Sequence, residues 1–177
     1  MTAELEIRPV RPDEYAAAGA VTMDAYREFA PQRSPEWAEY LVRIGDIAGR
    51  AGHTLVLIAL LDGSIAGTAT LELDHRVEAD RDPPARDEAH LRMLGVDPGL
   101  RRRGIARRLV DACIDEARQH GRMRFTLETT ERMVAAQALY RAMGFRWLGS
   151  REVAPGLIFE DFELPIAAAD AAVAGSA

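Results

Sequence analysis

A strand, a turn and a helix that begins at a glycine follow one another within residues 91–109, and no other segment limits the fold as strongly. The letters of this segment are LRMLGVDPGLRRRGIARRL. Residues 89–96 are mostly apolar and predict a strand, after which Asp97-Pro98-Gly99 predicts a turn. Beyond Gly104, apolar residues recur at helical spacing, at Ile105, Leu109, Cys113 and Ala117. A buried strand that turns into a helix with one apolar face is typical of layered α/β proteins.

The segments on either side predict further strands and helices. Strands are expected at residues 4–9, 54–61, 65–73, 124–129, 145–152 and 157–164, and helices at 11–29, 34–48 and 131–143. This order indicates an α/β (α+β) structure with a mixed sheet. A chain of 177 residues can bury one core, so we expect a single domain over residues 1–166 and a flexible alanine-rich tail over 167–177.

Charge and composition exclude several classes of function. The net charge of -6 argues against nucleic-acid binding, because duplex binding relies on many cations. All 22 cationic side chains are arginine, which excludes lysine Schiff-base chemistry and a P-loop lysine. The single cysteine, Cys113, is expected in the core, and the spacing of the acidic and histidine residues fits no metal site. No apolar run is long enough to span a membrane, so we expect a cytoplasmic protein without membrane association.

The start of the helix at Gly104 predicts a site for phosphate groups. A helix N-terminus presents unpaired N–H groups and the positive end of a dipole, and small residues at Gly104 and Ala106 leave those donors accessible. Neither a Walker A loop nor a dinucleotide fingerprint occurs here. The arginines of residues 101–108 alone are equally compatible with a solvated helix face.

Three motifs in order resemble the GNAT superfamily of acyl-CoA-dependent N-acetyltransferases. The residues RRRGIA at 101–106 match the family signature Q/R-x-x-G-x-G/A, LGVDP at 94–98 is similar to its central strand and turn, and ALYRAMGF at 138–145 is similar to its second motif. The resemblance implies a mostly antiparallel mixed sheet of about seven strands flanked by about four helices. It also implies acetyl-CoA as the co-substrate, with no metal.

By this resemblance, the strand at residues 94–96 splays from its neighbour and offers backbone groups to the pantetheine arm, while the start of the next helix holds the pyrophosphate. Met133 stands where many members carry an asparagine that contacts the cofactor. The implied cofactor-binding residues are Leu94, Gly95, Val96, Arg101, Arg102, Arg103, Gly104, Ile105, Ala106 and Arg107.

The resemblance also assigns catalytic roles. Tyr140 occupies the position of the family's tyrosine, whose hydroxyl protonates the leaving thiolate, although a core tyrosine would show the same spacing. An amine must lose a proton before it attacks a thioester, so a base is needed. His90 aligns with the family's acidic base, and Glu88 and Glu128 are alternatives.

The predicted function is therefore acetyl transfer from acetyl-CoA to a primary amine by direct attack. The alternative is a non-catalytic acyl-CoA-binding or sensor module with the same fold. The expected acceptor is a small-molecule amine or a peptide N-terminus. The mostly acidic loop at residues 74–88 would attract a cationic amine, and the aromatic side chains of Tyr26, Phe29 and Trp37 would wall its site. The oligomeric state stays open, with a homodimer as one alternative.

Overall fold

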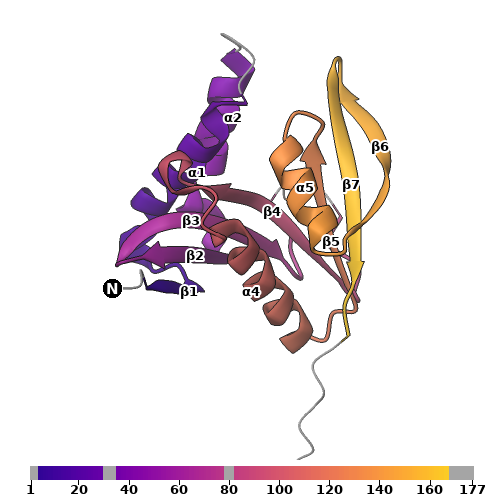
Figure 1. The fold of residues 1–177 in the computed structure, drawn as a ribbon, viewed down its shortest axis with the longest axis horizontal. Coiled ribbons are helices and arrows are strands. Elements are labelled where there is room, and N and C mark those ends of the chain that lie inside the picture. The colour runs from indigo at the N-terminus through magenta and orange to yellow at the C-terminus, as the bar shows by residue number, and fades with distance from the viewer. Residues whose placement is uncertain (1–3, 30–34, 78–81, 168–177) are drawn as a thin grey trace, which may run out of the picture.

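One mixed sheet organises the computed structural model, which describes residues 4–29, 35–77 and 82–167 (Figure 1). Its seven strands lie in the order β1-β2-β3-β4-β5-β7-β6. All neighbouring pairs are antiparallel except β4 and β5, which run parallel. The strands are β1 Leu5–Pro9, β2 Leu55–Leu61, β3 Ser64–Glu72, β4 Glu88–Val96, β5 Arg124–Thr130, β6 Arg146–Ala154 and β7 Leu157–Pro165. The predicted mostly antiparallel sheet of about seven strands is confirmed.

Five α-helices occur in the described part of the chain, rather than the expected four, because the helix predicted at residues 34–48 is interrupted. Asp46 accepts a hydrogen bond from the Gly49 amide at 2.8 Å and caps a new helix. After this restart Ile47 and Arg50 are buried, whereas Ala48, the last residue of the predicted helix, is exposed. The helices are α1 Tyr15–Arg27, α2 Pro35–Gly45, α3 Ile47–Ala51, α4 Ile105–Gln119 and α5 Val134–Ala142.

Strand β2, which lies between β1 and β3, is buried on both faces. Leu57 and Ala59 belong to the core cluster that includes the apolar face of α4, while Val56 and Ile58 pack with residues of α1 and α3. This division explains why β2 is a continuous apolar run rather than an alternating one. Helices α4 and α5 therefore cover one face of the sheet, and α1 and α3 cover the other, while α2 packs against α1 (Figure 1).

Helix α4 has the predicted apolar stripe. Ile105, Leu109, Cys113 and Ala117 are all buried. The Cys113 thiol is fully enclosed, and burial raises its pKa, so the prediction of a core cysteine is confirmed. The helix ends before Gly121, which has a left-handed φ of 70°.

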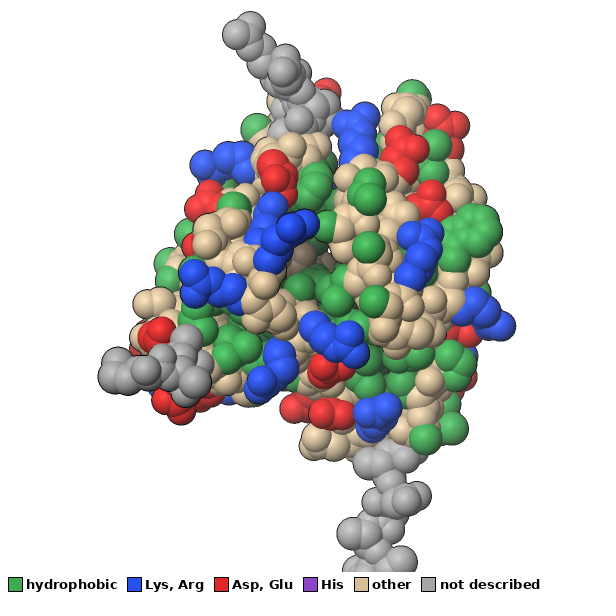
Figure 2. All heavy atoms as spheres, in the orientation of Figure 1, with side chains coloured by type: hydrophobic (Ala, Val, Ile, Leu, Met, Phe, Trp, Pro, Cys, Tyr) green, Lys and Arg blue, Asp and Glu red, His purple; other side chains and the backbone are tan. Residues whose placement is uncertain are grey.

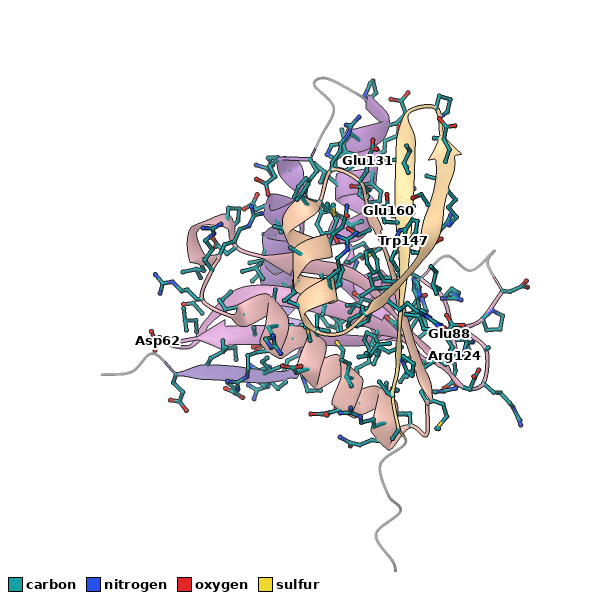
Figure 3. All side chains as sticks on the ribbon, turned by 45° about the vertical axis from the view of Figure 1, so that its right-hand side comes forward. Asp62, Glu88, Arg124, Glu131, Trp147 and Glu160 are labelled. Carbon is teal, nitrogen blue, oxygen red and sulfur yellow. The ribbon has the colours of Figure 1, made fainter. Side chains whose placement is uncertain are left out.

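The β6–β7 hairpin forms the far edge of the sheet. Trp147 on β6 donates a hydrogen bond from Nε1 to Glu160 on β7 at 2.6 Å, and the two side chains lie together in Figure 3. The predicted tail over residues 167–177 lies outside the described residues from Ala168 onward. None of the helices in the described ranges has the length and apolar character of a membrane span.

Candidate active site

Strands β4 and β5 separate after their first four paired residues, which produces a fork in the sheet. Their parallel register runs from Glu88 opposite Arg124 to Leu91 opposite Leu127 and stops there. Beyond this point β5 continues along β7, while β4 continues along β3 to Val96. Among the described residues, β4 is not paired with β5 beyond Leu91, so this side of the strand is open over residues 93–96. The expected splay is present.

A bulge in β4 accompanies the fork. Thr68 and Thr70 of β3 face Gly95 and Arg92, so β4 carries one extra residue between these pairs. Met93, inside the bulge, has a φ of 53°, which is rare for a residue with a side chain. Backbone strain of this kind is concentrated at functional sites, where surrounding structure holds it in place.

A cavity of about 760 Å³ opens at the fork. Its walls come from the end of α1, from residues 94–96 of β4, from the loop that starts α4, and from the start of α5. Figure 2 shows arginine side chains around a hollow with an apolar floor at the middle of this face. All the predicted cofactor residues line the cavity except Arg103, namely Leu94, Gly95, Val96, Arg101, Arg102, Gly104, Ile105, Ala106 and Arg107. Arg103 is exposed and is not among the lining residues.

The start of α4 presents its amides to this cavity. Gly104 is the N-cap, with φ 77° and ψ 3°, and no side chain caps the helix. The first helical bond runs from the Arg108 amide to the Gly104 carbonyl at 3.1 Å, so the amides of residues 105–107 precede the regular pattern. A Cβ on Gly104 would meet no atom within 4 Å, and it would therefore stand in the open space where an anion would approach. Glycine suits both this backbone conformation and this access.

The charge of the cavity is positive although the chain is acidic overall. Four arginines and one glutamate line it: Arg101, Arg102, Arg107, Arg132 and Glu28. Arg101 bonds to the Glu28 carboxylate and donates to the Ala25 carbonyl at 3.1 Å, and so ties the loop to the end of α1. Reasoning from the sequence missed this tie, and it missed Arg132. A hint lay in the position of Arg132 just after β5, since α/β sheets gather ligand residues at strand carboxyl ends.

The base candidates line a second cavity of about 450 Å³: Glu88 and His90 lie on the paired half of β4, and Glu128 lies on β5. Glu88, His90 and Glu128 all face it. The Glu128 carboxylate bonds to Arg151, which also reaches Asp161 at 3.1 Å. His90 is only 6% exposed. The structure thus brings the three predicted base candidates together.

Tyr140 lies in the core beside the first cavity rather than in its wall. It is 4% exposed and packs against Phe145 and Phe162, with ring centroids 5.6 and 6.0 Å away. Burial raises the pKa of Tyr140, so its hydroxyl keeps its proton at neutral pH. Tyr26 and Phe29, the other aromatic side chains expected near the acceptor, line the first cavity. Trp37 is not among the lining residues.

The fork between β4 and β5, the helix with Gly104 as its N-cap and the order of the motifs agree with a match to a known protein family. A model of the acetyltransferase (GNAT) family matches residues 22–145. The chain therefore belongs to the GNAT family, and the resemblance stated from its motifs is confirmed.

Individual relatives share parts of this chain. The ribosomal protein bS18-alanine N-acetyltransferase of Salmonella typhimurium is 42% identical over 59 residues, which are 33% of this chain and 40% of the relative. The N-alpha-acetyltransferase RimI of Mycobacterium tuberculosis is 44% identical over 105 residues, which are 59% of this chain and 54% of the relative. The chain thus spans only about half the length of these curated relatives, or less.

Solved structures share the whole fold. The ribosomal-protein-S18-alanine N-acetyltransferase of Escherichia coli superimposes with a TM-score of 0.68 at 22% identity, over 97% of this chain and all (100%) of the other. The protein yncA of Salmonella typhimurium, solved with its cofactor acetyl-CoA, gives a TM-score of 0.65 at 19% identity, over 97% of this chain and 99% of the other.

Proposed function

We propose that this protein transfers an acetyl group from acetyl-CoA to the α-amine of a peptide N-terminus. The observation that carries the proposal is the cationic cavity at the fork, where the amides at the start of α4 and the open edge of β4 face the same space. Both features suit one elongated ligand that is anionic at one end and amide-bearing along its length. We expect the transfer to take place in the cytoplasm.

The first cavity fits the parts of acetyl-CoA. The diphosphate would accept hydrogen bonds from the amides of residues 104–107, and the Arg102 and Arg107 side chains would offset its charge. The pantetheine amides would pair with residues 94–96, as an added strand does at a sheet edge. Arg103 points outside this arrangement and is left without a role in it. Acetyl-CoA supplies the activated acetyl group.

The second cavity suits the amine acceptor. Its carboxylates Glu88, Glu128 and Asp161 would attract an ammonium group, although Arg76 and Arg151 offset part of that charge. An α-amine has a pKa of about 8, whereas a lysine side chain has about 10.4, so the α-amine gives up its proton more readily to a histidine. The relatives named for acetylating a ribosomal protein alanine support the same acceptor class.

Two residues of the chain would move protons at the reacting atoms. His90 precedes Leu91, the last residue of β4 paired with β5, and from the closed end of the fork it would take the proton of the attacking amine. Tyr140, whose pKa is raised by burial, would donate its proton to the sulfur of the coenzyme A thiolate as the C–S bond breaks. Glu88 would act through its contacts to the histidine rather than as the base.

A turnover assay with matched acceptors tests this function. Release of free thiol from acetyl-CoA is followed with a peptide that begins in alanine, with the same peptide blocked at its N-terminus, and with a lysine-bearing blocked peptide. We expect turnover with the first only. If acetyl-CoA raises the melting temperature but no amine is acetylated, the chain is a non-catalytic acyl-CoA-binding module instead. Turnover with small amines alone would assign a different acceptor class.

A further inference from the structure

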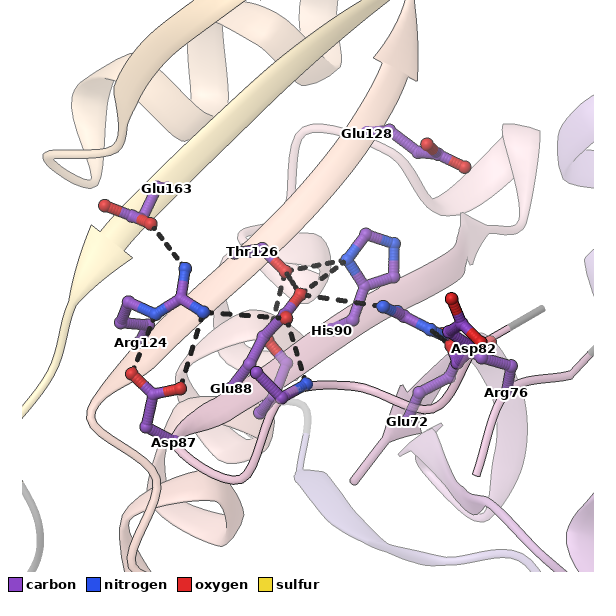
Figure 4. Close-up of polar contacts among 12 residues, drawn as sticks. Glu72, Arg76, Asp82, Asp87, Glu88, His90, Arg124, Thr126, Glu128 and Glu163 are labelled. Carbon is purple, nitrogen blue, oxygen red and sulfur yellow. Dashed lines mark hydrogen bonds and ion pairs between the residues drawn. The ribbon is translucent and has the colours of Figure 1, made fainter. Parts of the chain in front are cut away.

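A chain of short hydrogen bonds links two strands beneath the second cavity (Figure 4). Thr126 on β5 lies directly opposite His90 on β4 in the parallel register. Its hydroxyl is 2.7 Å from Nδ1 of His90 and 2.6 Å from the Glu88 carboxylate, to which it donates. The direct distance from His90 Nδ1 to the Glu88 carboxylate is longer, at 3.9 Å. Thr126 therefore stands between the carboxylate and the imidazole.

The proton positions in this chain follow from chemistry. A hydroxyl has one proton, and an ionised carboxylate can only accept. Because the Thr126 proton is used toward Glu88, the Thr126 oxygen can receive only a donor from His90. That donor is an N–H at Nδ1, so a neutral His90 carries its proton on Nδ1 and its lone pair on Nε2.

Neighbouring groups hold the Glu88 carboxylate, and with it the hydrogen-bonded chain, in place. Guanidinium groups flank the carboxylate, with Arg124 at 3.7 Å and Arg76 at 3.8 Å, and the Ala85 amide donates to it at 3.3 Å. Arg124 is itself held by Asp87 at 2.9 Å. Figure 3 shows Glu88 and Arg124 side by side at the same end of the sheet.

We propose that Thr126 is a positioning residue that fixes the tautomer of His90, so that Nε2 is the nitrogen able to accept the proton of the amine. This inference rests on the proposed function for its catalytic meaning, while the tautomer itself can be observed without any turnover. Other charged groups act on the same imidazole from its neighbours: Glu72 lies opposite it on β3, Arg76 pairs with Glu72 at 3.0 Å, and Arg92 and Glu128 follow on β4 and β5. They surround His90 in every variant compared, so a difference between variants reports on the hydroxyl.

The test compares Thr126→Val, which removes the hydroxyl at nearly constant shape, with Thr126→Ser, which keeps it. Nitrogen NMR of the imidazole groups, with His90 assigned through His90→Gln, reports which nitrogen carries the proton at alkaline pH. We expect an Nδ1-protonated His90 in the native chain and in Thr126→Ser, and a loss of that preference in Thr126→Val. Thr129→Val is the matched control, because Thr129 is a buried threonine of the same strand that bonds to Met133 instead.

Turnover gives a second readout. In Thr126→Val, kcat/KM should fall about tenfold to a hundredfold, the range for losing an outer partner that orients a histidine, and its pH profile should shift. The affinity for acetyl-CoA and the melting temperature of Thr126→Ser should stay close to native values. An Nε2-protonated His90 in the native chain, or the same tautomer in the native chain and Thr126→Val, would overturn the inference. Absence of turnover with the predicted tautomer in place would instead count against the proposed function.

Discussion

The two halves of β4 differ in what lies beside them. From Glu88 to Leu91 the strand pairs with β5 and carries two polar side chains, the half-buried Glu88 and the buried His90, which line a cavity with carboxylates. Beyond Leu91 the strand is not paired with β5 among the described residues, and residues 94–96 line a cavity formed by arginines and a helix start. Under the proposed function, the paired half of β4 would handle the proton of the amine, and the other half would bind the anionic cofactor.

The residue at which β4 stops pairing with β5 therefore separates the two cavities along the strand. Paired backbone groups are satisfied, so only side chains are left for chemistry, as His90 and Glu88 are. Backbone N–H and C=O groups outside the strand pairing can instead form hydrogen bonds with the amides of a ligand. The bulge at Met93 lies between the two halves of the strand and bends it there.

The largest expected effect is on the paired half. His90→Gln should lower kcat/KM on the order of 10²- to 10⁴-fold, because the amine then loses its base. Acetyl-CoA titration by calorimetry should give an unchanged Kd, since the open half is untouched. A parallel loss of affinity and turnover would show that the two halves do not act separately.

Protonation of the leaving thiolate should depend on Tyr140. We expect Tyr140→Phe to reduce kcat by about 10²-fold, because the proton donor is lost while the ring packing against Phe145 and Phe162 is kept. Steady-state kinetics with the preferred peptide measures the change. Native kcat in this variant would mean that Tyr140 is a core residue only.

The open half can be tested through the backbone of α4. Gly104→Val should raise the Kd of acetyl-CoA about tenfold or more, because a side chain keeps the diphosphate from the helix amides. Gly121→Val is the matched control: Gly121 is at the other end of the same helix, has φ 70° against 77°, and also has open space around its Cβ position. Both variants should lose similar stability, and only the first should lose affinity. Equal affinity in the two would exclude the helix start as the binding site.

The smallest expected effect lies far from both halves. Arg8 on β1 donates two hydrogen bonds to the Glu14 carboxylate, at 2.8 and 2.6 Å. These bonds lower the pKa of Glu14 from 4.5 to about 2. Because the folded pKa is lowered, this stabilisation is complete above pH 4.5 and is lost as pH falls toward 2. Thermal melts of the native chain and Glu14→Gln should differ by only a few degrees at neutral pH and converge in acid. A constant difference at all pH values would contradict the assignment.

Local patterns predicted most of the fold and the first cavity. The strands predicted at residues 4–9, 54–61 and 65–73 and the apolar stripe of α4 depend on neighbours in sequence, and the structure has all of them, with the strand ends within one residue of the prediction. The break at Asp46 was missed because a capping aspartate looks like any polar residue on a helix surface. Helix α5 begins at Val134, three residues later than expected.

The second cavity could be predicted only in part. His90 and Glu88 were found through their place in a motif, but Thr126 was not, because it comes from a strand 36 residues later whose register with β4 is set by tertiary packing. The same holds for Arg101, whose bond to Glu28 crosses 73 residues. Contacts between distant segments leave no periodic trace in a sequence.

Hydrogen exchange along β4, measured by mass spectrometry with and without acetyl-CoA, tests whether the cofactor binds along the half of the strand that is not paired with β5. We expect acetyl-CoA to slow exchange at residues 92–96 and in the first turn of α4, while residues 88–91, which are already paired, stay unchanged. Slowing confined to the paired half, or no slowing at either place at saturating acetyl-CoA, would contradict the account.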